Sequence, residues 1–317
     1  MSILVIGGTG FIGSRIIRQL VQRGRQVVCL DAYPNTTAIR DVANKVKLVK
    51  GDVVFIDDIL SVIKENNISA IVNLAYIMGA ESDANPHLAI RVNVLGMDNV
   101  FEAARLAGVK RVIYPSSIAY HGLQSYLGDK VVSESDLGYL PVQTYSATKR
   151  LNEYMASKYS ENYGMEIAGI RASIVYGHGR ERGLTVWSSH FASNPAVGKK
   201  IVFPYPPSQK ANIVYIDDIA DMFVRLLLAP SVKHTIYLSG GHEVTLCDLA
   251  EVVKDLIPSA DFRFEPSGKE IPLVYRIDSS RFEQEFGFKH LPLREAVKKH
   301  INEAREVAGL PALGWDS

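Results

Sequence analysis

A tyrosine and a lysine stand four residues apart in a segment with helical spacing. In Tyr145-Ser-Ala-Thr-Lys149 this i, i+4 spacing places both side chains on one helix face, one turn apart. A free tyrosine has a pKa near ~10 and is a poor base at neutral pH, but a neighbouring ammonium favours the phenolate. Such a phenol can exchange a proton with a substrate hydroxyl. The competing interpretation is a surface helix that carries both residues by chance.

Two serines follow the apolar run Arg111–Tyr114. If that run is a strand of a parallel sheet, Ser116 and Ser117 lie at its carboxyl edge, where open α/β sheets hold their ligands. A hydroxyl there can bind the reacting oxygen and orient it toward Tyr145. We assign this role to Ser117 and keep Ser116 as the alternative on the substrate side. A loop serine that satisfies only local backbone is the competing interpretation for each.

Glycines punctuate the first strand-to-helix turn. Residues 7–13 read Gly-Gly-Thr-Gly-Phe-Ile-Gly, directly after the apolar run Ile3–Ile6 and at the start of a helical pattern. Gly7 permits a tight turn, Gly10 lets the backbone approach a pyrophosphate, and Gly13 lets helix and strand pack closely. The helix N-terminus would then face the phosphates. The alternative is an ordinary strand-to-helix turn.

An aspartate ends the second apolar run, 18 positions after Gly13. The carboxylate of Asp31 can accept hydrogen bonds from both ribose hydroxyls of an adenosine and would repel a 2′-phosphate, which favours NAD over NADP. A solvated turn aspartate is the alternative. With a nicotinamide nearby, Tyr145 would take a proton from a substrate hydroxyl as hydride leaves for the cofactor. Lys149 would hold the nicotinamide ribose.

The elements that must position these residues alternate along the first 120 residues. Strands this apolar are covered on both faces, which predicts α/β class: a Rossmann-type doubly wound parallel sheet followed by a smaller mixed α/β C-terminal substrate lobe. We expect an NAD-binding domain over 1–176 and the lobe over 177–317, with 212–238 returning to the main domain. Strands are expected at 3–6, 26–30, 46–49, 70–74, 111–114 and 166–171, and helices at 11–23, 56–66, 86–107, 144–163, 217–229, 246–256 and 293–308.

Composition excludes several classes of function. Lys and Arg number 35 against 34 Asp and Glu, so a net charge of +1 offers no field for nucleic acid or an anionic membrane surface. Cys29 and Cys247 make no disulfide framework, and we expect a cytoplasmic protein. The N-terminus carries no signal peptide pattern, and no apolar run is long enough for a membrane span. Eight histidines without ligand spacing predict no metal site.

Together these motifs resemble the extended short-chain dehydrogenases/reductases of the NAD-dependent epimerase/dehydratase family, the group that includes UDP-glucose 4-epimerase. The likeness spans most of the chain. Further motifs that carry it are Gly51-Asp52-Val53, Asn73-Leu74-Ala75, Asn93-Val94-Leu95-Gly96, Arg171 with Val175-Tyr176-Gly177, and Val214-Tyr215-Ile216-Asp217-Asp218.

The resemblance implies a catalytic set of Ser117, Tyr145 and Lys149. It also implies a homodimer, formed through the helices that match 86–107 and 144–163. Cofactor contacts follow by position: Phe11 and Ile12 supply amides near the pyrophosphate, Asp52 and Val53 contact adenine, Leu74 and Ala75 line the cofactor, Asn93 braces the site, and Tyr176 lies close to the nicotinamide.

The chain departs from the family pattern on the substrate side. Tyr76 replaces the last alanine of the usual His-Leu-Ala-Ala. At about the position where the epimerase has a lysine, this chain has Met78. Each of the two side chains either lines the substrate site or packs in the protein interior. Lys269-Glu270-Ile271-Pro272 occupies the region of an arginine clamp for a diphosphate. In the loop after Tyr176, Arg180 or Arg182 can bind a carboxylate or phosphate, or else belongs to a solvated loop.

These observations favour an NAD-dependent oxidoreductase or epimerase. It would transfer hydride at a secondary alcohol or ketone of a sugar-like or small hydroxy substrate, with tyrosine as acid and base. A nucleotide-sugar 4-epimerase that retains its NAD is one alternative. A non-catalytic NAD-binding sensor or scaffold is another, although a mere binder does not need Ser117, Tyr145 and Lys149 together.

Overall fold

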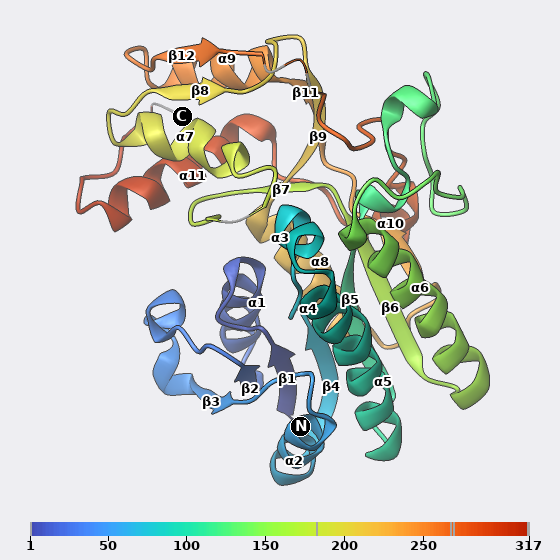
Figure 1. Cartoon of the computed structure of the whole chain (residues 1–317). Coiled ribbons are helices and arrows are strands. Elements are labelled where there is room, and N and C mark those ends of the chain that lie inside the picture. Colours follow the sequence, from blue (N-terminus) through green and yellow to red (C-terminus); the bar gives the residue numbers. More distant parts are fainter. Residues whose placement is uncertain (1, 182, 267, 269, 316–317) are drawn as a thin grey trace.

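The computed structural model describes residues 2–181, 183–266, 268 and 270–315, and its main feature is a seven-stranded parallel sheet (Figure 1). The strand order is β10-β6-β5-β4-β1-β2-β3, so the order reverses between β1 and β4. This is the doubly wound sheet that the alternating apolar runs predict. Its strands are β1 (Ser2–Ile6), β2 (Gln26–Asp31), β3 (Val46–Lys50), β4 (Ile68–Asn73), β5 (Arg111–Ser117), β6 (Glu166–Ala172) and β10 (Ile236–Leu238).

Helices cover both faces of this sheet because its strands are apolar on both sides. On one face α1 (Phe11–Gln22) packs beside α8 (Ile216–Leu228). The other face carries α2 (Ile56–Asn66), α5 (Gly96–Leu106) and α6 (Thr144–Tyr163). The buried residues divide accordingly into two large apolar clusters.

The small lobe lies beyond the carboxyl ends of the large sheet's strands (Figure 1). One of its sheets has the order β11-β9-β7, and β8 pairs with β12 in a second. Three helices pack together beside them. The elements are β7 (Ile174–Tyr176), α7 (Trp187–Ala196), β8 (Ile201–Phe203), β9 (Lys210–Tyr215), β11 (His242–Thr245), α9 (Leu246–Leu256), β12 (Phe262–Phe264) and α11 (Leu293–Val307).

Some elements differ from the sequence-based expectation. The helix expected over 86–107 consists of α4 (Pro86–Ala89), a π-helical segment (Ile90–Leu95) and α5. Short helices α3 (Gly79–Ala84) and α10 (Ser280–Phe286) were not expected, because segments of six and seven residues carry too little periodicity. Helix α7 was also missed; it contains Pro195 and three serines.

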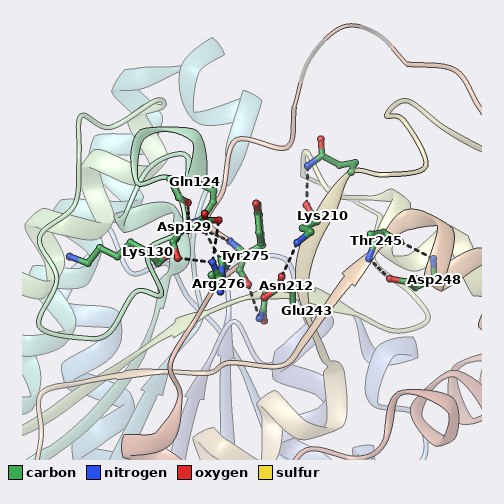
Figure 2. Close-up of polar contacts among 12 residues, drawn as sticks. Gln124, Asp129, Lys130, Lys210, Asn212, Glu243, Thr245, Asp248, Tyr275 and Arg276 are labelled. Carbon is green, nitrogen blue, oxygen red and sulfur yellow. Dashed lines mark hydrogen bonds and ion pairs between the residues drawn. The ribbon is translucent and has the colours of Figure 1, made fainter.

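A crossing segment, residues 271–278, ties the lobe to the loop after β5 (Figure 2). The Gln124 amide oxygen accepts from the backbone N–H groups of Tyr275 and Arg276, at 3.1 and 3.2 Å. Arg276 donates to the carbonyl of Asp129, and Asn212 on β9 donates to the carbonyl of Tyr275. Both lobes are therefore joined by polar contacts at this point. None of the described helices is long and apolar enough to cross a membrane.

Candidate active site

In the glycine turn between β1 and α1, backbone segments pack too closely to leave room for side chains. Gly7 has φ +70°, and a Cβ there would lie 3.0 Å from the backbone nitrogen of Ala75. A Cβ on Gly13 would lie 2.4 Å from the Gly7 carbonyl oxygen. Gly10 begins α1 without a side-chain cap, so the N–H groups of the first turn, at Phe11 and Ile12, have no capping partner there. This turn fits a pyrophosphate at the helix N-terminus.

Asp31 ends β2 beside that turn. Its carboxylate accepts from the N–H and hydroxyl of Thr9, at 3.2 and 2.6 Å, and from the N–H of Tyr33 at 3.1 Å. These contacts fix the carboxylate next to the glycines, where an adenosine ribose would lie. Next along the sheet, Asp52 accepts from the N–H of Val54 at 3.0 Å, and Val53 is buried.

The end of β4 forms the opposite wall at the reversal of strand order. The Asn73 side chain accepts from the N–H of Ala75 at 3.1 Å, which bends Leu74 and Ala75 against the glycine turn. Asn93, in the π-helical segment, bonds both backbone groups of Ile77 at 2.8 and 2.9 Å. Asn93 thus holds the segment that leads from β4 into the cleft.

Helix α3 holds the start of α6. The Ser82 hydroxyl, fully buried, accepts from the N–H of Tyr145 at 3.1 Å, and Asp83 accepts from the N–H of Thr144 at 2.8 Å. Two unsatisfied donors of α6 are thereby capped from another helix. Sequence reasoning had no signal for this cap, because the partners are more than 60 residues apart.

Ser117 and Arg180 both influence the Tyr145 phenol. Burial raises the pKa of Tyr145 above its usual value, whereas a hydrogen bond from Ser117 and the positive charge of Arg180 lower it. The Ser117 oxygen accepts from the N–H of Ala119 at 3.1 Å, which leaves its own proton for the phenol. Ser117 and Tyr145 therefore lie close together at the carboxyl end of β5, the sheet edge at which the sequence predicts Ser117.

Lys149 lies differently from our expectation. Its ammonium donates to the Pro115 carbonyl at 2.6 Å and sits 3.2 Å from the centroid of the Tyr76 ring, but 5.2 Å from that of Tyr145. Burial holds the pKa of Lys149 well below its usual value, and the carboxylate of Glu153 acts in the opposite direction. Arg180 adds a further positive charge that lowers the pKa of the Tyr145 phenol.

Two predicted residues point away from the cleft. The hydroxyl of Ser116 donates to Glu153, which also forms an ion pair with Arg171, so Ser116 does not reach the substrate side. The ring of Tyr176 is fully buried against Phe191, and it does not line a cleft. Glu153 carries no motif of its own, and only its place one turn after a lysine could have drawn attention to it.

The loop after β7 approaches Tyr145 from the small lobe. Arg180 donates to the Val175 carbonyl at 3.0 Å. Its other terminal nitrogen lies near Gly183, where the thioether end of Met78 also approaches. Arg180 and Met78 thus lie together beside the start of α6. Arg182 lies outside the described residues.

Comparisons with known proteins agree with this architecture. A UDP-glucose 4-epimerase from Mycolicibacterium smegmatis is 26% identical over 315 residues, covering 95% of this chain and 97% of the relative. The crystal structure of the Thermus thermophilus UDP-glucose 4-epimerase complex with NAD has a TM-score of 0.83 at 23% identity, covering 96% of this chain and 99% of that one. L-threonine 3-dehydrogenase from Trypanosoma brucei has a TM-score of 0.86 at 21% identity, with 98% and 99% covered.

The fold, the glycine turn and the comparisons define the class as an NAD-dependent enzyme of the extended short-chain dehydrogenase/reductase type. A model of the NAD-dependent epimerase/dehydratase family matches residues 3–239, and the chain belongs to that family. The N-terminus of α1, which no side chain caps, fits the pyrophosphate of NAD, and the carboxylate of Asp31 fits its adenosine ribose.

Proposed function

We propose that this enzyme oxidises a secondary alcohol, or reduces the matching ketone, with Tyr145 as acid and base. NAD, when bound, supplies the hydride acceptor. Ser117 orients the reacting oxygen, and Tyr145 takes the proton from it during oxidation or returns it during reduction. Lys149 supplies a positive charge behind the phenol and holds the nicotinamide ribose. The observation that supports the proposal is that Ser117, at the end of β5, lies close enough to Tyr145, at the start of α6, for its hydroxyl to lower the pKa of the Tyr145 phenol.

The substrate we propose is a small hydroxy or keto compound with an anionic group. Arg180 reaches the same phenol from the small lobe, and a guanidinium matches a carboxylate or phosphate in shape and charge. Lys210 pairs with Glu243, and Arg276 pairs with Asp129, where the crossing segment meets β9 and the loop after β5 (Figure 2). This pairing disfavours a diphosphate clamp there.

The test combines calorimetry with a substrate panel. NAD is titrated into the purified protein after removal of any retained dinucleotide, and NADH formation is followed with hydroxy acids, neutral polyols and nucleotide sugars. We expect micromolar NAD binding and NADH formation on a hydroxy acid. Binding of NAD with turnover only on neutral alcohols would reject the anionic substrate, and no NAD binding would reject the proposal as a whole.

A nucleotide-sugar 4-epimerase is the second candidate. Relatives named UDP-glucose 4-epimerase or putative UDP-glucose 4-epimerase align over 95% of the chain. Retained NAD, no net NADH and interconversion of two nucleotide sugars would establish it. A protein that binds NAD and turns over no alcohol or sugar would instead be the non-catalytic binder.

The assembly we propose is a homodimer through the helical segments 86–107 and 144–163. These helices lie side by side on one face of the large sheet (Figure 1). Ile90, Leu95 and Leu151 are 50%, 44% and 44% exposed there. Sedimentation of the wild type and of Leu151→Glu tests the interface, since a charge in an apolar dimer contact should yield monomers.

A further inference from the structure

We propose that Tyr76 is a positioning residue whose ring face holds the Lys149 ammonium in place and in its charged form. This inference rests on the proposed function, because Lys149 matters only if Tyr145 is the acid and base. Tyr76 stands at a position where the family pattern has alanine. From the sequence alone its side chain could either contact the substrate or pack in the interior, and the proposal gives it a third role.

The first support is the position of the ammonium. The Lys149 nitrogen lies 3.2 Å from the Tyr76 ring centroid, well inside the range of about 6 Å over which a ring face attracts a cation. Lys149 is only 1% exposed, and among the described residues no carboxylate lies within ion-pair distance of it. The ring face and the Pro115 carbonyl are therefore what replaces water around this charge.

The second support is that the ring is held rigidly. The Tyr76 hydroxyl lies 2.7 Å from the Thr148 hydroxyl, and the Asn152 amide donates to it at 3.3 Å. Asn152 in turn donates to the Asn93 carbonyl at 2.8 Å. The ring also meets Tyr145 edge to face, with centroids 5.4 Å apart. Contacts on both sides of Lys149 along α6 thus fix the plane against which its ammonium rests.

Other titratable groups around Lys149 also influence whether its ammonium stays charged. Glu153, one turn further along α6, favours the charged lysine, but its oxygens already bind Arg171 and Ser116. The ammonium lies close to the rings of Tyr76 and Tyr145, and Tyr114 on β5 is fully buried. Because burial penalises the ammonium, loss of the ring face leaves the carbonyl and a distant, shared carboxylate to balance it.

The test measures the titration of Lys149 directly, by carbon NMR of lysine-labelled protein without NAD. The Lys149 signal is assigned by its loss in Lys149→Arg. Tyr76→Leu should lower the pKa of Lys149 by about one unit or more, given the strength of a desolvated cation–π contact. Tyr76→Phe keeps the ring face, although it loses the hydroxyl contacts that hold it, and should retain most of the wild-type titration. As a matched control, Phe262→Leu removes the ring beside the exposed Lys254 and should leave Lys149 unchanged.

Activity gives a second readout. In Tyr76→Leu the alkaline limb of the kcat/KM profile should move to lower pH, because Lys149 then loses its proton earlier, while Tyr76→Phe follows the wild type. An unchanged Lys149 titration in folded Tyr76→Leu would overturn the inference, as would an equal shift in Tyr76→Phe. If Lys149 shifts but no alcohol is turned over by the wild type, the proposed function fails and the placement of Lys149 stands.

Discussion

Two buried cations lie one turn apart along helix α6, and their surroundings differ: we call the end at Lys149 its reactive side and the end at Glu153, which binds Arg171 of β6, its structural side. Arg171 is 3% exposed and meets both oxygens of Glu153, at 3.0 and 2.7 Å. Lys149 is 1% exposed and rests on a carbonyl and a ring face. A bidentate ion pair fixes charge and geometry together. A cation without a carboxylate partner remains able to act on a neighbouring phenol, and this difference separates the structural side of α6 from the reactive side.

The largest effect should come from the reactive side. Tyr145→Phe removes the proton donor and acceptor, and kcat/KM should fall by ~10²- to 10⁴-fold. NAD affinity measured by calorimetry should stay close to that of the wild type. Tyr159→Phe is the control, since the hydroxyl of Tyr159 contacts Asp98 away from the cleft. Full activity of Tyr145→Phe would remove the distinction between the two sides.

On the structural side, Glu153→Gln leaves the Arg171 guanidinium buried without its counter-ion. Breaking a buried pair in this way should cost about 3–5 kcal/mol of unfolding free energy, measured by urea denaturation. Glu161→Gln breaks the exposed pair with Lys158 on the same helix and should cost less than ~1 kcal/mol. Equal losses in the two variants would contradict the comparison.

Acid should lower the free energy of unfolding through His121, which lies beside Arg171 on the structural side. Burial, together with the charge of Arg171, lowers the pKa of His121 to about 3 from the 6.5 of the unfolded chain. The unfolded state therefore binds the proton first, and stability is lost as pH falls from 6.5 toward 3. At pH 5 this costs about 2 kcal/mol. Urea denaturation of His121→Gln against the wild type between pH 7 and 5 should show a shallower decline, and parallel curves would reject this account.

The smallest effects should separate two adjacent serines. Ser117→Ala removes the hydrogen bond to Tyr145 and should lower kcat by about tenfold, with stability nearly unchanged. Ser116→Ala removes a hydrogen bond to Glu153 and should cost about 1–2 kcal/mol of unfolding free energy, with kcat nearly unchanged. Rates and urea midpoints measured on both variants decide this, and a reversed pattern would exchange the two roles.

The sequence predicted the elements far better than the contacts between them. Apolar runs located six strands of the large sheet, and α2, α6 and α9 begin and end where their spacing predicts. The glycine turn followed from the local glycine spacing, and the position of Ser117 at the carboxyl edge of the sheet followed from the apolar run that precedes it. These features depend on backbone periodicity, which a sequence displays directly.

The contacts that were missed all depend on tertiary packing. Ser82 caps α6 from another helix, and Glu153 divides its oxygens between Arg171 and Ser116. The rotation of the Lys149 ammonium toward Tyr76 depends on which aromatic ring fills the space after β4. No local pattern encodes such choices, because several side chains from distant segments decide them jointly.

The outermost strand of the large sheet, β10, reaches its place only after the chain has passed through much of the small lobe. A nascent chain that has emerged only as far as residue 176 therefore presents β6 with an unpaired edge and lacks α8 on the face that carries α1. On the ribosome, the large sheet and the helix layer over it are complete only after residues 216–238, which form α8 and β10, have been synthesised. Its maturation is coupled to synthesis of the segment that builds the substrate side.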